Sequence, residues 1–260
     1  MIREKLIDKG IGHNKKFRWR SHEISRIEGL SDAVFGFAVT LLVVSLEVPR
    51  TFAELMQTMR GFGAFAISFT LLLLVWYNQY KFFRRYGLQD AMTLSLNCFL
   101  LFVVLFYVYP LKFLFTFLVS LFTGGQGRIR LPTGAEVMMV DSNEQVSTLM
   151  IIFGAGYIAI FGVFVLLYWH AYRKRGELNL NELEILDTRT DIQESFLNVG
   201  IGSLSVAIAA LGGGRYSFPA GMVYMLNAVV SPVHGMMMGK RRRKLEERCT
   251  SNENASLESD

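Results

Sequence analysis

The stretch that decides the fold is AMTLSLNCFLLFVVLFYVYPLKFLFTFL, residues 91–118. A helix that crosses the hydrocarbon core of a bilayer, ~30 Å thick, needs about 20 mostly apolar residues. This stretch is longer than that and contains one charged side chain, Lys112. It therefore predicts a transmembrane helix rather than a helix of a soluble domain.

The other apolar residues also lie in long blocks. Of the 260 residues, 52% are apolar and 19% are charged. That composition is too apolar for a typical soluble domain and argues against a soluble enzyme. Six blocks are long and apolar enough to cross a bilayer. They are residues 30–48, 61–83, 91–118, 147–170, 192–212 and 217–238.

These blocks predict the domain organisation. We expect an all-α membrane protein with six transmembrane helices per chain, formed by residues 26–239. A basic leader, residues 1–25, precedes this unit. Residues 240–260 begin with a basic run and continue with few apolar groups, which predicts a disordered tail. The fifth block is rich in Gly, Ala and Ser, which favours close helix packing, and the sixth is expected to bend at Pro232.

Lys and Arg predict the orientation of the helices, because cytoplasmic flanks retain them. Four alternate regions hold 21 of the 27 basic residues. These regions are residues 3–26, 81–85, 173–189 and 240–248. Both termini are therefore expected in the cytoplasm, and the polar loop 119–146 is expected outside. Membrane orientation also explains the net charge of +5 without a nucleic-acid partner.

Cysteine and histidine offer no constellation for catalysis. Cys98 lies in an apolar block and Cys249 in the polar tail, so neither a disulfide framework nor a cysteine metal site is expected. The four histidines have no paired spacing; they are His13, His22, His170 and His234. We therefore expect no enzyme, no cofactor and no resident metal.

The entry of the first block carries ionisable residues, in contrast to the other blocks. Arg26, Glu28 and Asp32 lie in or beside its first turns. An ionisable residue beside an apolar run is a candidate functional group. Ser31 and Asp32 could equally cap the positive end of a helix, and both alternatives stay open at this point.

Arg26 and Asp32 need partners on other helices. At 100° per residue they lie about 240° apart on one helix, so they cannot pair along it. Buried polar groups in hydrocarbon must be satisfied within the protein. The candidates for a shared network at the inner end of the bundle are Asn78, Gln79, Asp90 and Asn97.

The opening of the first block resembles a known motif. Arg26, followed after three residues by Leu30, Ser31 and Asp32, is similar to the Arg-x-x-x-Phe-Ser-Asp motif of the transmembrane protein 175 family, the lysosomal potassium channels and their prokaryotic relatives. Further similar positions extend the resemblance over residues 26–110; they are Thr40, Glu47, Pro49, Trp76, Asp90, Asn97 and Pro110.

The resemblance implies a homotetramer of six-helix units in a prokaryotic plasma membrane, with the first helix of each chain lining the pore. It places Phe37, Leu41 and Val44 at the constriction and Thr40 near the narrowest point. The spacing i, i+4, i+7 independently puts the first three on one helix face. The family lacks a carbonyl-lined filter, and this sequence contains no TVGYG-like stretch.

Four positions depart from the family pattern. Leu30 replaces the motif Phe, and Phe37 replaces a smaller aliphatic residue at the constriction. Gln79 and Tyr80 stand where many prokaryotic members have a histidine pair, so a pH-sensitive contact of those histidines is not expected here.

We expect a channel that conducts monovalent cations, prefers potassium over sodium and has potassium ions, lipid and its own copies as partners. Glu47 near the outer end either concentrates cations or is simply solvated. The alternative is a secondary transporter with an ion- or proton-coupled site at Asp32, Asp90 and Asn97. The two halves of the sequence show no similarity that would support inverted repeats.

Overall fold

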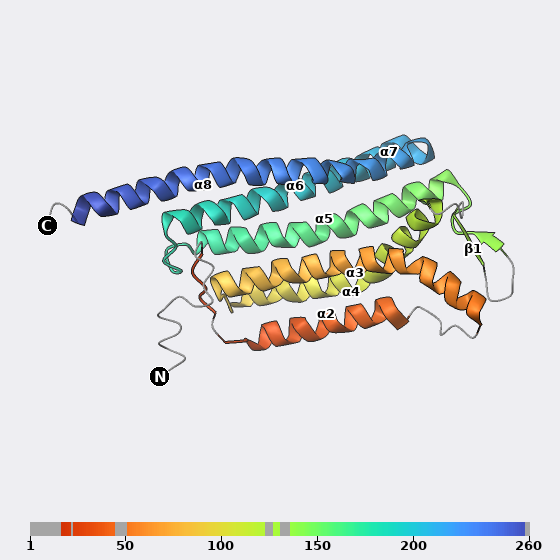
Figure 1. Ribbon diagram of the computed structural model, residues 1–260, viewed down its shortest axis with the longest axis horizontal. Helices are drawn as coiled ribbons and strands as arrows, with labels where there is room; N and C mark the ends of the chain where they lie inside the picture. Colours follow the sequence, from red (N-terminus) through yellow and green to blue (C-terminus); the bar gives the residue numbers. More distant parts are fainter. Residues whose placement is uncertain (1–16, 22, 45–50, 123–126, 131–135, 258–260) are drawn as a thin grey trace.

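The computed structural model describes residues 17–21, 23–44, 51–122, 127–130 and 136–257, and it is built from long helices (Figure 1). Some side chains within these ranges, including that of Val44, are not described. The long helices are α2 (Arg26–Val44), α3 (Phe52–Tyr86), α4 (Ala91–Phe122), α5 (Asn143–Arg173), α6 (Glu182–Gly212) and α8 (Asn227–Leu257). Between α6 and α8 lie a 3-10 turn (Gly213–Tyr216), the short helix α7 (Ser217–Met222) and a second 3-10 turn (Val223–Leu226).

Successive long helices run antiparallel, so the start of α2 and the end of α8 lie at the same end of the bundle (Figure 1). This end also holds the end of α3, the end of α5 and the start of α6. We call it the basic end, because Arg20, Arg85, Arg173 and Arg242 lie there. The described parts of the four regions rich in Lys and Arg thus meet on one side of the molecule.

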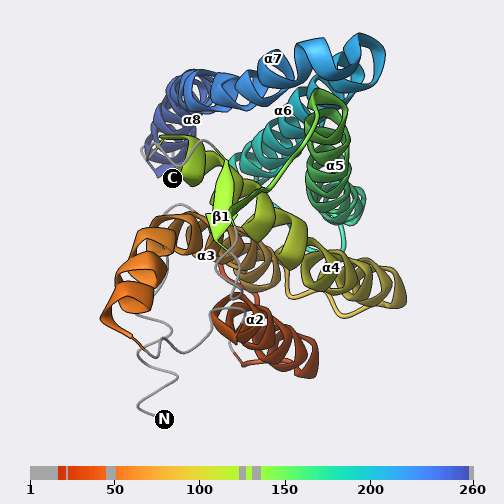
Figure 2. The ribbon, with the colours of Figure 1, turned by 90° about the vertical axis from the view of Figure 1, so that its right-hand side faces the viewer.

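The helices pack in an order that follows the chain. The α2 helix packs against α3 and α4, α4 packs against α5, and α6 lies between α5 and α8. Viewed along the bundle, α2 lies at one edge and α7 and α8 lie at the opposite edge (Figure 2). The α2 helix therefore keeps one face free of the other helices of its own chain.

Four stretches of the described residues are long and apolar enough to cross a membrane. They are Gly61–Tyr86, Ala91–Leu121, Asn143–Arg173 and Glu182–Arg248. The last stretch contains both α6 and α8, which lie side by side in opposite directions (Figure 1). The α2 helix is not among the four, because Arg26, Glu28 and Asp32 interrupt its apolar character and residues 45–48 of the predicted span lie outside the described residues.

Small residues let α5 approach its neighbours closely. A Cβ atom added at Gly202 of α6 would lie 2.9 Å from Ile158, and one added at Gly156 would lie 2.2 Å from the ring of Tyr107 on α4. Neither position has room for a larger side chain without a shift of the helices. The predicted close packing of the Gly-rich fifth segment is confirmed at Gly202.

Three local features differ from the sequence-based expectations. Within the polar loop, β1 (Arg128–Arg130) pairs antiparallel with β2 (Glu136–Met138), so the described chain is not entirely helical. The sixth segment breaks at residues 213–226, while Pro232 lies inside α8. Instead of ending in a disordered tail after Glu246, α8 continues to Leu257, and the pair of Arg242 with Glu246 supports the helix at i,i+4 spacing.

Candidate pore helix and its contacts

The first turn of α2 is capped by Ser25 and Glu28, which precede the Ser31 and Asp32 positions of the motif. The Glu28 backbone N–H donates to the Ser25 hydroxyl at 3.2 Å, and the Ser25 backbone N–H donates to the Glu28 carboxylate at 2.8 Å. This reciprocal pair is a capping box, whose Ser-x-x-Glu pattern is visible in the sequence. The structure therefore assigns capping to Ser25 and Glu28, while Ser31 and Asp32 lie one turn further along.

Ser31 takes part in a buried chain of hydrogen bonds across three helices. The Gln79 amide of α3 donates to the Asn97 carbonyl oxygen at 2.9 Å, and the Asn97 amide of α4 donates to the Ser31 hydroxyl at 3.0 Å. Ser31 in turn donates to the backbone oxygen of Ile27 at 2.8 Å. All three side chains are buried. Because each bond satisfies a polar group that lacks water, the chain of bonds fixes how α2 lies on α3 and α4.

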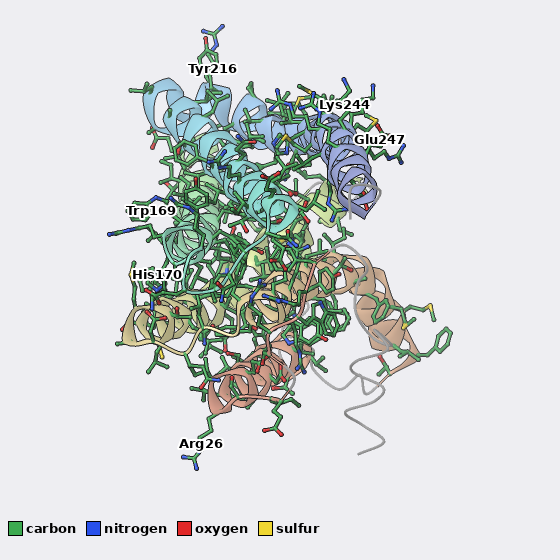
Figure 3. The ribbon with its side chains drawn as sticks, turned by 90° about the vertical axis from the view of Figure 1, so that its left-hand side faces the viewer. Arg26, Trp169, His170, Tyr216, Lys244 and Glu247 are labelled. Atoms are coloured by element: carbon green, nitrogen blue, oxygen red, sulfur yellow. The ribbon has the colours of Figure 1, made fainter. Side chains whose placement is uncertain are left out.

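Asp32 has a partner that differs from the four polar candidates. The Trp76 indole N–H of α3 donates to its carboxylate at 2.8 Å. The sequence contained a signal for this contact, because an indole N–H in a membrane helix needs an acceptor. Arg26 is exposed, points away from the bundle (Figure 3) and makes no hydrogen bond to the described residues. Thus Arg26 lies apart from the Ser31–Asn97–Gln79 chain.

Asp90 also lies apart from that chain, in a separate contact at the basic end. Its carboxylate accepts from the Thr93 hydroxyl at 2.7 Å and lies 2.7 Å from Nε2 of His170 and 3.9 Å from the Lys174 ammonium. Burial disfavours the charged carboxylate, but the bonds from Thr93 and His170 and the nearby positive charges outweigh that effect and lower the pKa of Asp90. This contact joins the start of α4 to the end of α5.

The face of α2 that points away from α3 and α4 contains two of the predicted pore residues. Phe37 is 57% exposed, and Thr40 is exposed with its hydroxyl donating to the backbone oxygen of Phe37 at 2.7 Å. Leu41 is partly buried against the core, so it lies at the margin of this face. Val44 ends α2, and its side chain lies outside the described ones.

A lysine lies beside the other end of α2. The Lys112 ammonium of α4 donates to the backbone oxygen of Leu42 at 2.9 Å. The last carbonyls of a helix lack intrahelical donors and carry partial negative charge, so a cation stabilises them. Sequence reasoning treated Lys112 only as the single charge of an apolar segment and missed this contact.

The leader ties the start of α2 to the start of α6. Arg20 forms an ion pair with Glu184 at 2.6 Å, and both side chains are largely buried. Phe17 is also buried, with the Arg85 guanidinium 4.7 Å from the centre of its ring. Further ion pairs at this end join α3 to α6 through Asp191 and α8 to α6 through Asp187. The basic end is therefore held by charge pairs between helices.

One segment in the N-terminal part of the chain matches a family model. The family described as endosomal/lysosomal potassium channel TMEM175 matches residues 26–107. That range contains α2, α3 and the buried part of α4 that carries Asn97. The contacts of Ser31 and Asp32 described above thus lie within the matched residues.

Known proteins are similar over nearly the whole chain. A potassium channel from Marivirga tractuosa is 40% identical over 244 residues, which cover 93% of this chain and 98% of that protein. A crystal structure of a variant of the potassium channel MtTMEM175, bound to a nanobody–MBP fusion protein, has a TM-score of 0.75 at 40% identity and covers 87% of this chain and 98% of that chain. A crystal structure of a TMEM175 homologue from Chamaesiphon minutus shares the fold, with a TM-score of 0.52 at 21% identity over 82% of this chain and 99% of that one.

Proposed function

Because this chain belongs to the TMEM175 family of potassium channels, we propose that four copies form a pore lined by α2 that conducts potassium in preference to sodium. The observation that carries this proposal is the free face of α2. Phe37 and Thr40 lie on it without a partner among the described residues of the other helices. A membrane helix at the edge of its own bundle can present such a face to copies of itself.

The polar contacts of α2 support this role. A pore helix has to keep its rotation, since a small turn about its axis would replace the residues that face the ion. The bonds of Ser31 to Asn97 and of Asp32 to Trp76 join the helix to two different neighbours. Ser31 is buried and Asp32 is exposed, so the first bond lies in the packed face of α2 and the second outside it. Together they hold the proposed pore residues toward the symmetry axis.

The proposed pore works without a carbonyl-lined filter. Four copies of Phe37, with Leu41 and Val44, form a hydrophobic constriction that blocks ions when it dewets. The Thr40 hydroxyls replace part of the hydration shell of a cation that passes. We propose that the basic end faces the cytoplasm, because the membrane potential and anionic lipids favour Lys and Arg on that side.

The transporter alternative receives less support from the geometry. Its three candidate residues would have to converge on one ion, yet Asp32 contacts Trp76, Asp90 contacts His170, and Asn97 contacts Ser31. In the described part of the chain they therefore belong to separate contacts. The family relationship also indicates a channel rather than an enzyme.

The proposal is tested by cation flux from proteoliposomes under potassium and sodium gradients. The native chain should pass potassium faster than sodium, and Phe37→Ala and Thr40→Ala should change the rate or the preference. Phe196→Ala is the matched control, because Phe196 is a similarly exposed ring on α6, 65% exposed. A native chain that reconstitutes correctly but passes no cation would contradict the channel; equal effects of Phe37→Ala and Phe196→Ala would contradict the placement of the constriction.

A further inference from the structure

Three arginines at the basic end have no acidic partner. Arg173 is the last residue of α5, Arg175 follows two residues later, and Arg189 lies in the first part of α6. No carboxylate of the described residues lies within 4.0 Å of their guanidinium groups. The more buried basic side chains at this end behave differently, since each pairs with a carboxylate; they are Arg20, Lys81, Arg84, Arg85, Lys174 and Arg242.

The three arginines instead stack on two aromatic rings. The Arg173 guanidinium lies 5.2 Å from the centre of the Trp169 ring, and those of Arg175 and Arg189 lie 4.8 and 5.2 Å from the centre of the Tyr172 ring. Arg189 also donates to the Tyr172 hydroxyl from Nη2 at 2.5 Å and from Nε at 3.2 Å. We call these five residues the arginine–aromatic cluster.

The cluster lies on the outer side of the bundle. Its three arginines are exposed, and Trp169 is 45% exposed and points away from the other helices (Figure 3). The α4 helix separates α5 from α2, so the cluster is far from the free face of α2 (Figure 2). Exposed Trp and Tyr at the end of a transmembrane helix lie at the level of the lipid headgroups.

We propose that the arginine–aromatic cluster binds the phosphate of an anionic phospholipid. A guanidinium fork matches two phosphate oxygens, and its positive charge is not neutralised by the protein here. The rings of Trp169 and Tyr172 hold the arginine side chains in place. The Tyr172 hydroxyl holds Arg189 of α6 beside the end of α5. Basic pockets between transmembrane helices are suited to such headgroups. The lipid would hold α5 and α6 together at this end.

Lipid retention by the full chain tests the proposal. The protein is reconstituted in vesicles of phosphatidylcholine and phosphatidylglycerol in equal parts, extracted in mild detergent and weighed with its bound lipids by native mass spectrometry. The native chain should retain phosphatidylglycerol preferentially. The triple variant Arg173→Gln, Arg175→Gln, Arg189→Gln should lose about tenfold or more of that preference, since it removes the charged hydrogen-bond donors that the cluster offers to the phosphate, and one hydrogen bond to a charged group contributes about tenfold.

Two further variants distinguish binding at the arginine–aromatic cluster from attraction of the lipid by the overall positive charge. Lys240→Gln, Arg241→Gln, Arg243→Gln removes the same charge from an exposed part of α8 and should keep the preference. The variant Arg173→Lys, Arg175→Lys, Arg189→Lys keeps the positive charge and the topology but loses the guanidinium fork. It should lower the preference for phosphatidylglycerol several-fold. The proposal is overturned if the glutamine variant at the cluster retains phosphatidylglycerol like the native chain, if the α8 variant loses as much, or if the lysine variant retains the full preference.

Discussion

Asn97 is the residue on which the contact between α2, α3 and α4 depends. Its amide both donates to Ser31 and accepts from Gln79, and no part of its side chain is exposed. Asn97→Ala would remove both bonds, so the buried Gln79 amide would lose its acceptor and the Ser31 hydroxyl would keep only its bond to Ile27. We expect a loss of about 1–2 kcal/mol of stability, measured as a lower unfolding midpoint in detergent.

The same helix offers a control for this change. Ser95 lies on α4 two residues away and is exposed, so Ser95→Ala should leave the unfolding midpoint nearly unchanged. If Asn97→Ala is as stable as Ser95→Ala, the hydrogen-bonded chain does not hold α2 in place.

Asp90 makes a contribution to stability that depends on pH. Its pKa in the folded chain is lower than the usual value of about 4 that applies when the chain is unfolded. The contribution is therefore complete above about pH 4, where the carboxylate is charged in both states, and is lost as the pH falls through the lower, folded value.

Replacement of Asp90 by the neutral amide tests this contribution. Asp90→Asn keeps the shape but removes the charge that faces His170 and Lys174. The difference in unfolding midpoint between native chain and variant should be largest near neutral pH and should shrink as the pH is lowered toward about 3. A difference that stays constant over this range would contradict the charge-based contact.

At the scale of elements, the spacing of α4 and α5 depends on a glycine. A Cβ atom at Gly156 would lie 2.2 Å from Cδ2 of Tyr107, whose hydroxyl is held by the backbone oxygen of Phe153. The ring cannot move away without breaking that bond, so Gly156→Ala should force the two helices apart. We expect a loss of about 1–3 kcal/mol, read from unfolding in detergent.

Another glycine of α5 controls for the backbone effect of the change. Gly162 has no atom within 4 Å of an added Cβ, so Gly162→Ala should be neutral or slightly stabilising. Equal destabilisation by both substitutions would contradict the role of the Tyr107 contact, because helix propensity favours Ala over Gly and Gly162 has room for the added methyl group.

The helices differ in how well the sequence predicted them. Long apolar runs placed α3, α4 and α5 correctly, because the thickness of a bilayer sets their length. The 3-10 turn at residues 223–226 inside the sixth segment and the helical continuation to Leu257 were not predicted, since they depend on packing against α6 and on charge pairs of α8. Likewise, Ser31, Gln79 and Asn97 were candidates, but Trp76 was not proposed as the partner of Asp32, because composition does not reveal which polar groups meet.

At the scale of the whole molecule, the charge distribution was easier to predict than the charge pairs. Counting Lys and Arg placed four regions on one side, and the described parts of these regions do meet at the basic end (Figure 1). The pairs themselves join residues far apart in the chain, such as Arg20 with Glu184. No periodicity in the sequence links such positions, so only the fold identifies them.

The proposed assembly makes a prediction about neighbouring chains. Four α2 helices that pack around one axis at the usual helix–helix distance of about 8–10 Å bring the same pore-facing residue of adjacent copies near the Cα separation of a disulfide, which is about 4.4–6.8 Å. Thr40→Cys, in a chain that also carries Cys98→Ser and Cys249→Ser, should therefore form covalent dimers under mild oxidation in the membrane. Denaturing electrophoresis without reductant would show them.

A cysteine placed far from α2 tests whether the cross-links come from assembly through this helix or from random collision of chains. Leu204 is 48% exposed on α6, and α2 makes no contact with that helix in the described structure. Leu204→Cys in the same background should stay monomeric on the gel, because four chains that meet at α2 hold their α6 helices apart. If Thr40→Cys stays monomeric as well, or if Leu204→Cys cross-links as fast, the copies do not meet at the free face of α2. The pore would then have to be sought on another surface.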